Sequence, residues 1–425
     1  MRLLVLLVAC TLFTAVIVVR FHQNRINAPT TTRRRRLYRL RLGPDPWVFN
    51  DPHTTILKST TLSTKSVARY DTAIATMTPL RICNRKVPIS HEVDVQMMQK
   101  FGNCQLLSNA PEETNILLIQ GDQTFGRTGN NLIEILHSLE YARDNGLVVA
   151  IRHYSWAAHV ITELWMAVQD EDISAWLEFI KQSLCILVVD SDDDMSRYKS
   201  VKFIDGKAGC MEMFYYTSES WDRVEYLSHI IRTLYRYVNL GVGVNMRREQ
   251  VGNSCSVLNA IFKDKYPKYS VIHSRSLEGP PGLRILKRIA TNSGCDETAA
   301  LFMAPDYIKS ILQPLGMLNH PILFISDHQN ATILERLMAD TDIGPNIQLI
   351  PPETSWIGSD ITAALMADVF TGNPASTFSG FIAKSRLAFG YDATFMFRKR
   401  SEDGNWVNAC DNVCIFDRQI MHAMA

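Results

Sequence analysis

The sequence has almost no net charge and lacks the repeats and cysteine pairs that mark several large protein classes. Its 425 residues carry 44 Lys and Arg against 43 Asp and Glu, a formal net charge of +1. A protein that binds mainly nucleic-acid phosphates is usually more basic, so we expect no nucleic-acid partner. No whole-chain repeat and no coiled-coil or collagen-like composition is present, which excludes solenoid and fibrous folds. None of the nine cysteines forms a CxxC pair, which argues against a zinc cluster.

The N-terminus supplies the one long apolar run. Residues 3–19 carry no charge, and Arg2 and Arg20 flank them. Seventeen apolar residues are at the short limit for a membrane-spanning helix, and long arginine side chains can extend that reach. A cleaved signal peptide is the competing interpretation, but no clear A-x-A site follows. We therefore expect a signal anchor at residues 1–20 and a basic, Thr-rich stem at residues 21–78.

Two features bear on the compartment, and they disagree. Eight arginines between residues 20 and 41, with no acidic residue among them, favour a cytosolic C-terminal region by the positive-inside rule. Eight cysteines outside the anchor, an even number, fit disulfides in an oxidising lumen, and Asn330-Ala-Thr332 is a glycosylation sequon. We expect a single-pass type II membrane protein facing the Golgi or ER lumen. The disulfide connectivity stays open, since eight cysteines allow 105 pairings.

The globular part alternates short apolar runs with amphipathic segments, which predicts parallel α/β sheets covered on both faces. Two blocks of this kind, divided near residues 241–253, predict Rossmann-like domains at residues 79–245 and 246–425, with ligands bound between them beyond the carboxyl ends of the strands. A helix is expected after the first of these strands, because one helical face is shared by the apolar residues Leu132, Ile135, Leu136, Leu139 and Ala142. Strands are expected at 115–120, 147–151, 185–189, 269–273, 322–325, 347–350 and 368–371, and further helices at 220–238, 306–312, 331–338, 360–366 and 378–387.

Three turn or strand-end motifs could bind an anion. Gly126-Arg-Thr-Gly-Asn-Asn131 lies between a strand and a helix, where glycines let the backbone approach a ligand, although a plain turn explains it equally well. His273-Ser-Arg275-Ser-Leu-Glu278 ends a strand, and its guanidinium suits bidentate binding of a diphosphate. The structural alternative is that His273 only supports the fold and that Arg275 forms a surface ion pair with Glu278.

The third motif runs from Asp360 to Gly380 and contains the turn Gly372-Asn-Pro-Ala-Ser-Thr377. Hydroxyl and N–H groups at the start of the following helix could hold a phosphate, and Ser376 and Thr377 could equally be ordinary N-caps.

A fourth motif favours a different chemistry. The apolar run at residues 185–189 ends in Asp190, Asp192, Asp193 and Asp194. A D-x-D of this kind can hold a divalent cation that bridges a sugar-nucleotide diphosphate. An acidic run that closes a strand is also typical of a solvated loop.

Together, the motifs resemble the GDP-fucose-dependent fucosyltransferase superfamily, which includes the protein O-fucosyltransferases and the α1,2- and α1,6-enzymes. His273-x-Arg275-x-x-Glu278 looks like the family's H-x-R-x-x-D motif with Glu in place of Asp, and residues 360–386 are similar to its C-terminal donor-binding motif. Residues 126–131 resemble its N-terminal glycine–asparagine loop. The three patches occur in the family's order but cover a small part of the chain.

The resemblance implies a GT-B type α/β fold, with two Rossmann-like domains facing a central cleft. It also implies an inverting transfer of fucose from GDP-fucose to a hydroxyl of a protein or glycan acceptor, with no metal or other cofactor. Arg275 would bind the β-phosphate as the main catalytic group, with His273 supporting the site. The remaining donor-binding and acceptor-side positions implied by the resemblance are Asp360, Ser376, Thr377, Phe378, Gly126, Gly129 and Asn130.

The general base is not fixed by the resemblance. An inverting transfer needs a group that takes the proton of the acceptor hydroxyl. Glu278 and Asp122 are both candidates. Two alternatives therefore stay open: a metal-dependent glycosyltransferase built on Asp190–Asp194, and a glycosyltransferase-like binding protein that does not catalyse.

Overall fold

The structure is a computed structural model, and the part of it described here is α/β. It covers residues 79–408 and Ile415, except residues 84, 103, 120–127, 153–180, 182, 190–192, 205, 237–254, 264, 266, 276–283, 285–301, 328–330, 352–353, 355–356 and 397. All of these belong to one compact unit, residues 61–425. The expected anchor and stem lie outside the described residues. Within the described part, no helix has both the length and the apolar character needed to span a membrane.

The first sheet has four parallel strands in the order β5-β4-β3-β6. Its strands are β3 (Asn115–Ile119), β4 (Val148–Arg152), β5 (Ile186–Val189) and β6 (Ser200–Ile204). Alternate residues of β3 enter different apolar clusters: Leu117 and Ile119 join the main core, whereas Ile116 and Leu118 join a smaller one on the opposite face. Burial on both faces explains why β3 and β4 are uninterrupted apolar runs.

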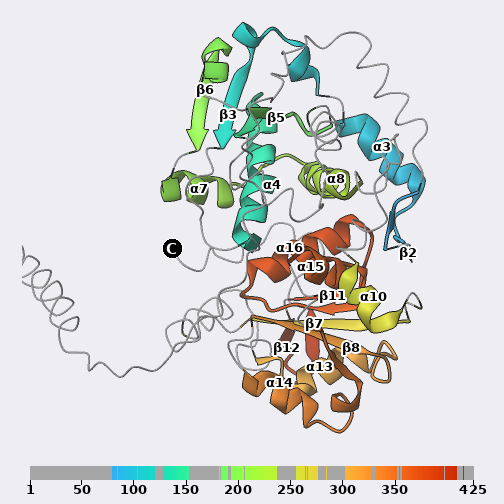
Figure 1. Ribbon diagram of the computed structural model, residues 1–425. Coiled ribbons are helices and arrows are strands. Elements are labelled where there is room, and N and C mark those ends of the chain that lie inside the picture. Colours follow the sequence, from blue (N-terminus) through green and yellow to red (C-terminus); the bar gives the residue numbers. More distant parts are fainter. Residues whose placement is uncertain are drawn as a thin grey trace, which may run out of the picture. The chain divides into compact units, whose positions relative to one another are not determined.

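The second sheet has five parallel strands in the order β11-β10-β7-β8-β9. They are β7 (Ser270–Ser274), β8 (Ile322–Ser326), β9 (Ile347–Leu349), β10 (Val369–Thr371) and β11 (Thr394–Phe395). In Figure 1, α15 (Ile357–Met366) and α16 (Thr377–Ala388) cover one face, and α13 (Pro305–Leu312) and α14 (Ala331–Met338) cover the other. This is the doubly covered parallel sheet that the alternation predicts.

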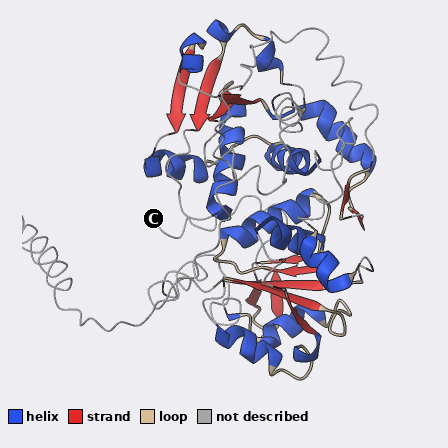
Figure 2. Ribbon diagram, viewed as in Figure 1, coloured by secondary structure: helices blue, strands red, loops and turns tan. Residues whose placement is uncertain are grey.

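The other elements are helical or form short hairpins (Figure 2). The helices are α3 (His91–Phe101), α4 (Thr128–Asp144), α7 (Gly206–Phe214), α8 (Arg223–Arg236) and α10 (Ser256–Phe262). The 3₁₀ turns are η1 (Gln105–Ser108), η2 (Pro111–Glu113), η3 (Asp193–Arg197) and η4 (Gly344–Asn346). The antiparallel pairs are β1 (Arg81–Ile82) with β2 (Arg85–Lys86), and β12 (Arg398–Arg400) with β13 (Trp406–Asn408).

The α/β prediction is confirmed, and most predicted elements are present within a few residues of their expected ends. The helix expected at residues 331–338 has those bounds. The prediction missed the helices α3, α7 and α10, the strands β6 and β11, and the two short hairpins. The cause is visible in α3, whose buried side chains are Asp94 and Met98, so it has no apolar stripe to detect. The division expected near residues 241–253 lies outside the described residues.

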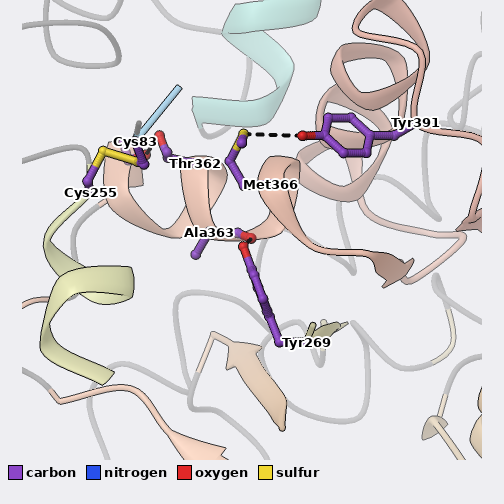
Figure 3. The surroundings of a disulfide bond; sticks show 8 residues. Cys83, Cys255, Tyr269, Thr362, Ala363, Met366 and Tyr391 are labelled. Carbon is purple, nitrogen blue, oxygen red and sulfur yellow. Dashed lines mark hydrogen bonds between the residues drawn. A yellow bond between two sulfur atoms is a disulfide. The ribbon is translucent and has the colours of Figure 1, made fainter. Parts of the chain in front are cut away.

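Two disulfides are present, Cys83–Cys255 and Cys104–Cys185, as an oxidising compartment would favour. The first joins the β1–β2 hairpin to the start of α10, close to α15 (Figure 3). Beside it, Arg85 donates to the carbonyl of Met366 at 3.1 Å. A segment from the start of the globular part is therefore fixed to the second sheet's helices. Cys210 is buried outside a disulfide, and Cys295, Cys410 and Cys414 lie outside the described residues.

A buried arginine fixes the end of α15 next to the second sheet. Arg386 of α16 is fully buried. Its guanidinium donates to the carbonyls of Ala364, Leu365 and Ala367 at 3.1, 2.8 and 2.6 Å. A cation is favourable at a helix C-terminus, where carbonyls lack helical partners. Arg386 thus ties the last turn of α16 to the end of α15.

Candidate functional site

The order of strands in the second sheet predicts where a ligand would bind. The chain runs from β7 outward through β8 to β9, then returns to place β10 on the other side of β7. In open parallel sheets, ligands bind beyond the carboxyl ends of the strands where the order reverses. Here that point lies between β7 and β10. The two motifs that end these strands, at His273–Arg275 and Gly372–Phe378, therefore lie at one sheet edge.

Arg275 follows β7 directly, and its partner comes from β8. Arg275 Nε lies 3.6 Å from Asp327 Oδ2, and the two side chains are 17% and 8% exposed. The expected alternative partner, Glu278, lies outside the described residues. The guanidinium is therefore held at the sheet edge by a nearly buried carboxylate. Sequence reasoning missed Asp327, although an Asp directly after the apolar run Ile322–Ser326 was a usable signal.

The turn after β10 is built around Asn373, which is fully buried. Its side-chain oxygen accepts from the backbone N–H of Ala375 at 2.9 Å, and its amide donates to the carbonyl of Arg275 at 3.3 Å. Its backbone N–H donates to Ser379 Oγ at 2.9 Å. Asn373 thus shapes the turn and also connects it to the end of β7. At Gly372, a Cβ would lie 2.9 Å from both Phe370 and Ser379, so this position has no room for a side chain.

His273 is buried and packs against the start of α16. Its Nδ1 lies 2.6 Å from Ser379 Oγ, and its ring centroid lies 5.0 Å from that of Phe378. Burial, together with the smaller effect of the nearby Arg275 charge, lowers the pKa of His273 to about 3, while Asp327 opposes the shift. The imidazole is therefore neutral near pH 7. It supports the turn as a hydrogen-bonding group and adds no positive charge.

Ser376 acts as the N-cap of α16. Its hydroxyl accepts from the N–H of Ser379 at 3.4 Å, which is the structural alternative considered for this residue. The next two residues, Thr377 and Phe378, occupy the first turn, where backbone N–H groups have no helical acceptor. The positive end of the helix dipole therefore lies at the turn that follows β10.

The start of α4 meets the start of α16. Thr377 Oγ donates to Asn130 Oδ1 at 2.6 Å. A Cβ built on Gly129 would lie 2.5 Å from the backbone nitrogen of Phe378, so only glycine fits this approach. The structure thus brings together residues from motifs almost 250 positions apart. Gly126 and Asp122 lie outside the described residues.

A buried polar face on α4 was also missed by the sequence analysis. His137 Nδ1 contacts the carbonyl of Phe214 at 2.8 Å, and burial and the nearby Lys384 charge lower its pKa to about 3. Burial raises the pKa of Glu134 to about 7, against a hydrogen bond with Cys210 that lowers it. Periodicity identified α4 from its apolar residues alone, and the i, i+3 spacing of Glu134 and His137 was the available signal.

The remaining predicted positions are placed only in part. Asp360 lies half-buried in the first turn of α15, the helix that follows β9. Asp193 and Asp194 begin η3 after β5, whereas Asp190 and Asp192 lie outside the described residues. Among the residues that the structure describes, no three His, Cys, Asp or Glu are grouped as metal ligands. The metal-based alternative therefore stays untested.

No family model and no curated protein sequence matches the chain. Among solved structures, POFUT1 in complex with GDP is similar with a TM-score of 0.38 and 12% identity, over 67% of this chain and 99% of that one. POFUT1 in complex with GDP-fucose gives 0.38 and 12%, over 68% and 99%. E. coli heptosyltransferase WaaC with ADP gives 0.25 and 9%, over 68% and 88%. At these TM-scores and identities the likenesses assign no activity to this chain, and an activity has to be argued from the site itself.

The site can stabilise a group that gains negative charge. It combines a held guanidinium, a glycine-containing turn and the first turn of α16 at one sheet edge. These are the donors that bind a phosphate or diphosphate without a cation. The neutral His273 contacts Ser379 and Phe378 at the start of α16, and Ser376 caps this helix.

Proposed function

We propose that this protein is a glycosyltransferase that transfers fucose from GDP-fucose to a hydroxyl of a protein or glycan acceptor, with inversion and without a metal. The observation that carries the proposal is the position of Arg275 at the switch point, beside the start of α16. Breaking the sugar–phosphate bond leaves negative charge on the departing GDP. Fixed donors that stabilise this charge lower the barrier to transfer.

Each group has a defined part in this proposal. Arg275 binds the β-phosphate and stabilises the leaving diphosphate. Phe378 and the first-turn N–H groups of α16 enclose the donor, and Asn130 lies across from them near the sugar or the acceptor. Asp360, Gly126 and Gly129 complete the proposed donor side. Glu278 and Asp122 remain the candidate bases.

The setting of the reaction also belongs to the proposal. The two disulfides support an oxidising compartment, and we propose a type II protein of the Golgi or ER lumen, held to the membrane through residues 1–20.

The test compares GDP-fucose turnover by the wild type, Arg275→Ala and Arg275→Lys, measured as GDP release over a panel of protein and glycan acceptors. We expect turnover to fall at least about 100-fold in both variants, because lysine lacks the planar fork. Arg400→Ala is a matched control, since Arg400 on β12 forms an ion pair with the exposed Asp306 on α13. Undiminished turnover by Arg275→Ala would refute the proposal.

Calorimetry with GDP separates catalysis from binding. GDP binding by the wild type without turnover on any acceptor would instead support a binding protein that does not catalyse.

A further inference from the structure

Asp327 has a position that no part of the proposed function uses. β7 and β8 pair in parallel register, with His273 opposite Ile325 and Ser274 opposite Ser326. Arg275 and Asp327 are the residues that directly follow these two strands. Since side chains alternate along a strand, residues at the same register step lie on the same side of neighbouring strands. The ion pair between them therefore follows from the sheet itself.

Asn373 and Asp327 contact different parts of Arg275. Asn373 holds its backbone, because the amide of Asn373 donates to the Arg275 carbonyl. Asp327 holds its side chain, because the carboxylate lies 3.6 Å from Nε. With Asp327 only 8% exposed, water screens the pair weakly. Asn373 thus contacts the backbone of Arg275, and Asp327 contacts its guanidinium.

The carboxylate also has a cost for ligand binding. A negative charge beside Arg275 reduces the attraction of the site for a diphosphate. It cannot be offset by His273, whose imidazole is neutral near pH 7 because it is buried. A countercharge at this place suits a site in which the direction of the guanidinium matters more than its net attraction. That condition applies to a reaction in which charge develops on one particular oxygen.

We propose that Asp327 is a positioning residue, which orients the Arg275 guanidinium toward the leaving phosphate at the expense of ground-state affinity for the nucleotide. The inference rests on the proposed function and adds a residue from a third strand to its site. If Asp327 orients Arg275, removing its charge lowers kcat without weakening GDP binding. If Asp327 is purely structural, removing its charge weakens both.

The test uses Asp327→Asn, which keeps the shape of the side chain and removes its charge. We expect kcat for GDP-fucose to fall about 10- to 100-fold, as for a misdirected catalytic group. We expect the Kd for GDP to stay unchanged or to decrease a few-fold, because the repelling charge is gone. Asp306→Asn is the matched control, since Asp306 also pairs with an arginine in the second half of the chain but is 62% exposed.

A double-mutant cycle shows whether Asp327 acts through Arg275. In an Arg275→Lys background, Asp327→Asn should change kcat less than about twofold, since the oriented fork is already absent. An equal loss of kcat in both backgrounds would overturn the inference. So would an unchanged kcat in the single variant, or a parallel loss of kcat, GDP affinity and melting temperature.

The two proposals fail in different ways. A wild type that neither binds GDP nor releases it from GDP-fucose would overturn the proposed function and this inference together. A wild type that does both, with an Asp327→Asn variant of equal kcat, would overturn the inference alone.

Discussion

Replacing Glu134 by Gln should change how the stability of the protein depends on pH. Glu134 lies on the buried face of α4 and is 5% exposed. Burial raises the pKa of its carboxyl from 4.5 to about 7, although the hydrogen bond with Cys210 favours the charged form. Between these values the folded protein retains a proton that the unfolded chain releases. The free energy of unfolding therefore decreases as the pH rises through this window.

The size of the effect follows from the shift. A difference of about 2.5 pKa units corresponds to roughly 3 kcal/mol at pH 8, as an upper value. Glutamine cannot ionise, so Glu134→Gln removes this loss. The variant should match the wild type near pH 4.5 and be more stable by about 1–3 kcal/mol at pH 8, since the new amide also has to find partners.

Urea unfolding at a series of pH values measures this difference. His137 and His273 have lowered pKa values, so they reduce stability as the pH falls below about 6.5, but they do so in both proteins and cancel in the comparison. Glu212→Gln is the control, since Glu212 is exposed on α7 and pairs with Lys202. Equal pH dependence in the wild type and Glu134→Gln would refute the reasoning.

Three further substitutions test the framework of the site. Gly129→Ala should lower the free energy of unfolding by about 1–3 kcal/mol and should also lower turnover under conditions where the variant is folded, because the new Cβ displaces the backbone at Phe378. Gly209→Ala, with ordinary space around the new Cβ, is the control in thermal melts and turnover assays. Arg386→Lys should destabilise by about 3–5 kcal/mol in urea unfolding, since one amine cannot satisfy the carbonyls that end α15; equal stability would contradict this capping role. The Cys83→Ser, Cys255→Ser double variant should have a free energy of unfolding lower by roughly 3–5 kcal/mol and a lower melting temperature than the wild type. Equal melting temperatures of the variant and the wild type, both measured without reductant, would show that the disulfide does not stabilise the fold.

The fold was largely predictable because its strands and main helices carry strong periodic signals. β8 is apolar from Ile322 to Ile325, and α14 places Ile333 and Leu337 on one buried face. The elements that escaped prediction are weakly patterned. β6 is an edge strand whose Phe203 is 51% exposed, so it lacks both the continuous apolar run and a clean alternation.

The site residues were predictable where they belong to one sequence motif. They were not predictable where the pairing of strands brings distant residues into contact. Arg275 and the turn at Asn373 were visible as motifs. Asp327 lies fifty-two positions beyond Arg275, and the two meet because β7 and β8 are neighbours in register. A sequence shows the residue that ends each strand, but the order of the strands decides which of these residues meet.

Titration calorimetry of the full chain with GDP tests the central claim most directly. The account predicts that GDP binds, that Arg275→Lys weakens binding by about tenfold or more through loss of the bidentate contact, and that excess chelator leaves the affinity unchanged. UDP and ADP serve as comparison ligands and should bind more weakly. Absence of GDP binding, or equal affinity of the wild type and Arg275→Lys for GDP, would contradict a nucleotide-diphosphate site at the ends of β7 and β10.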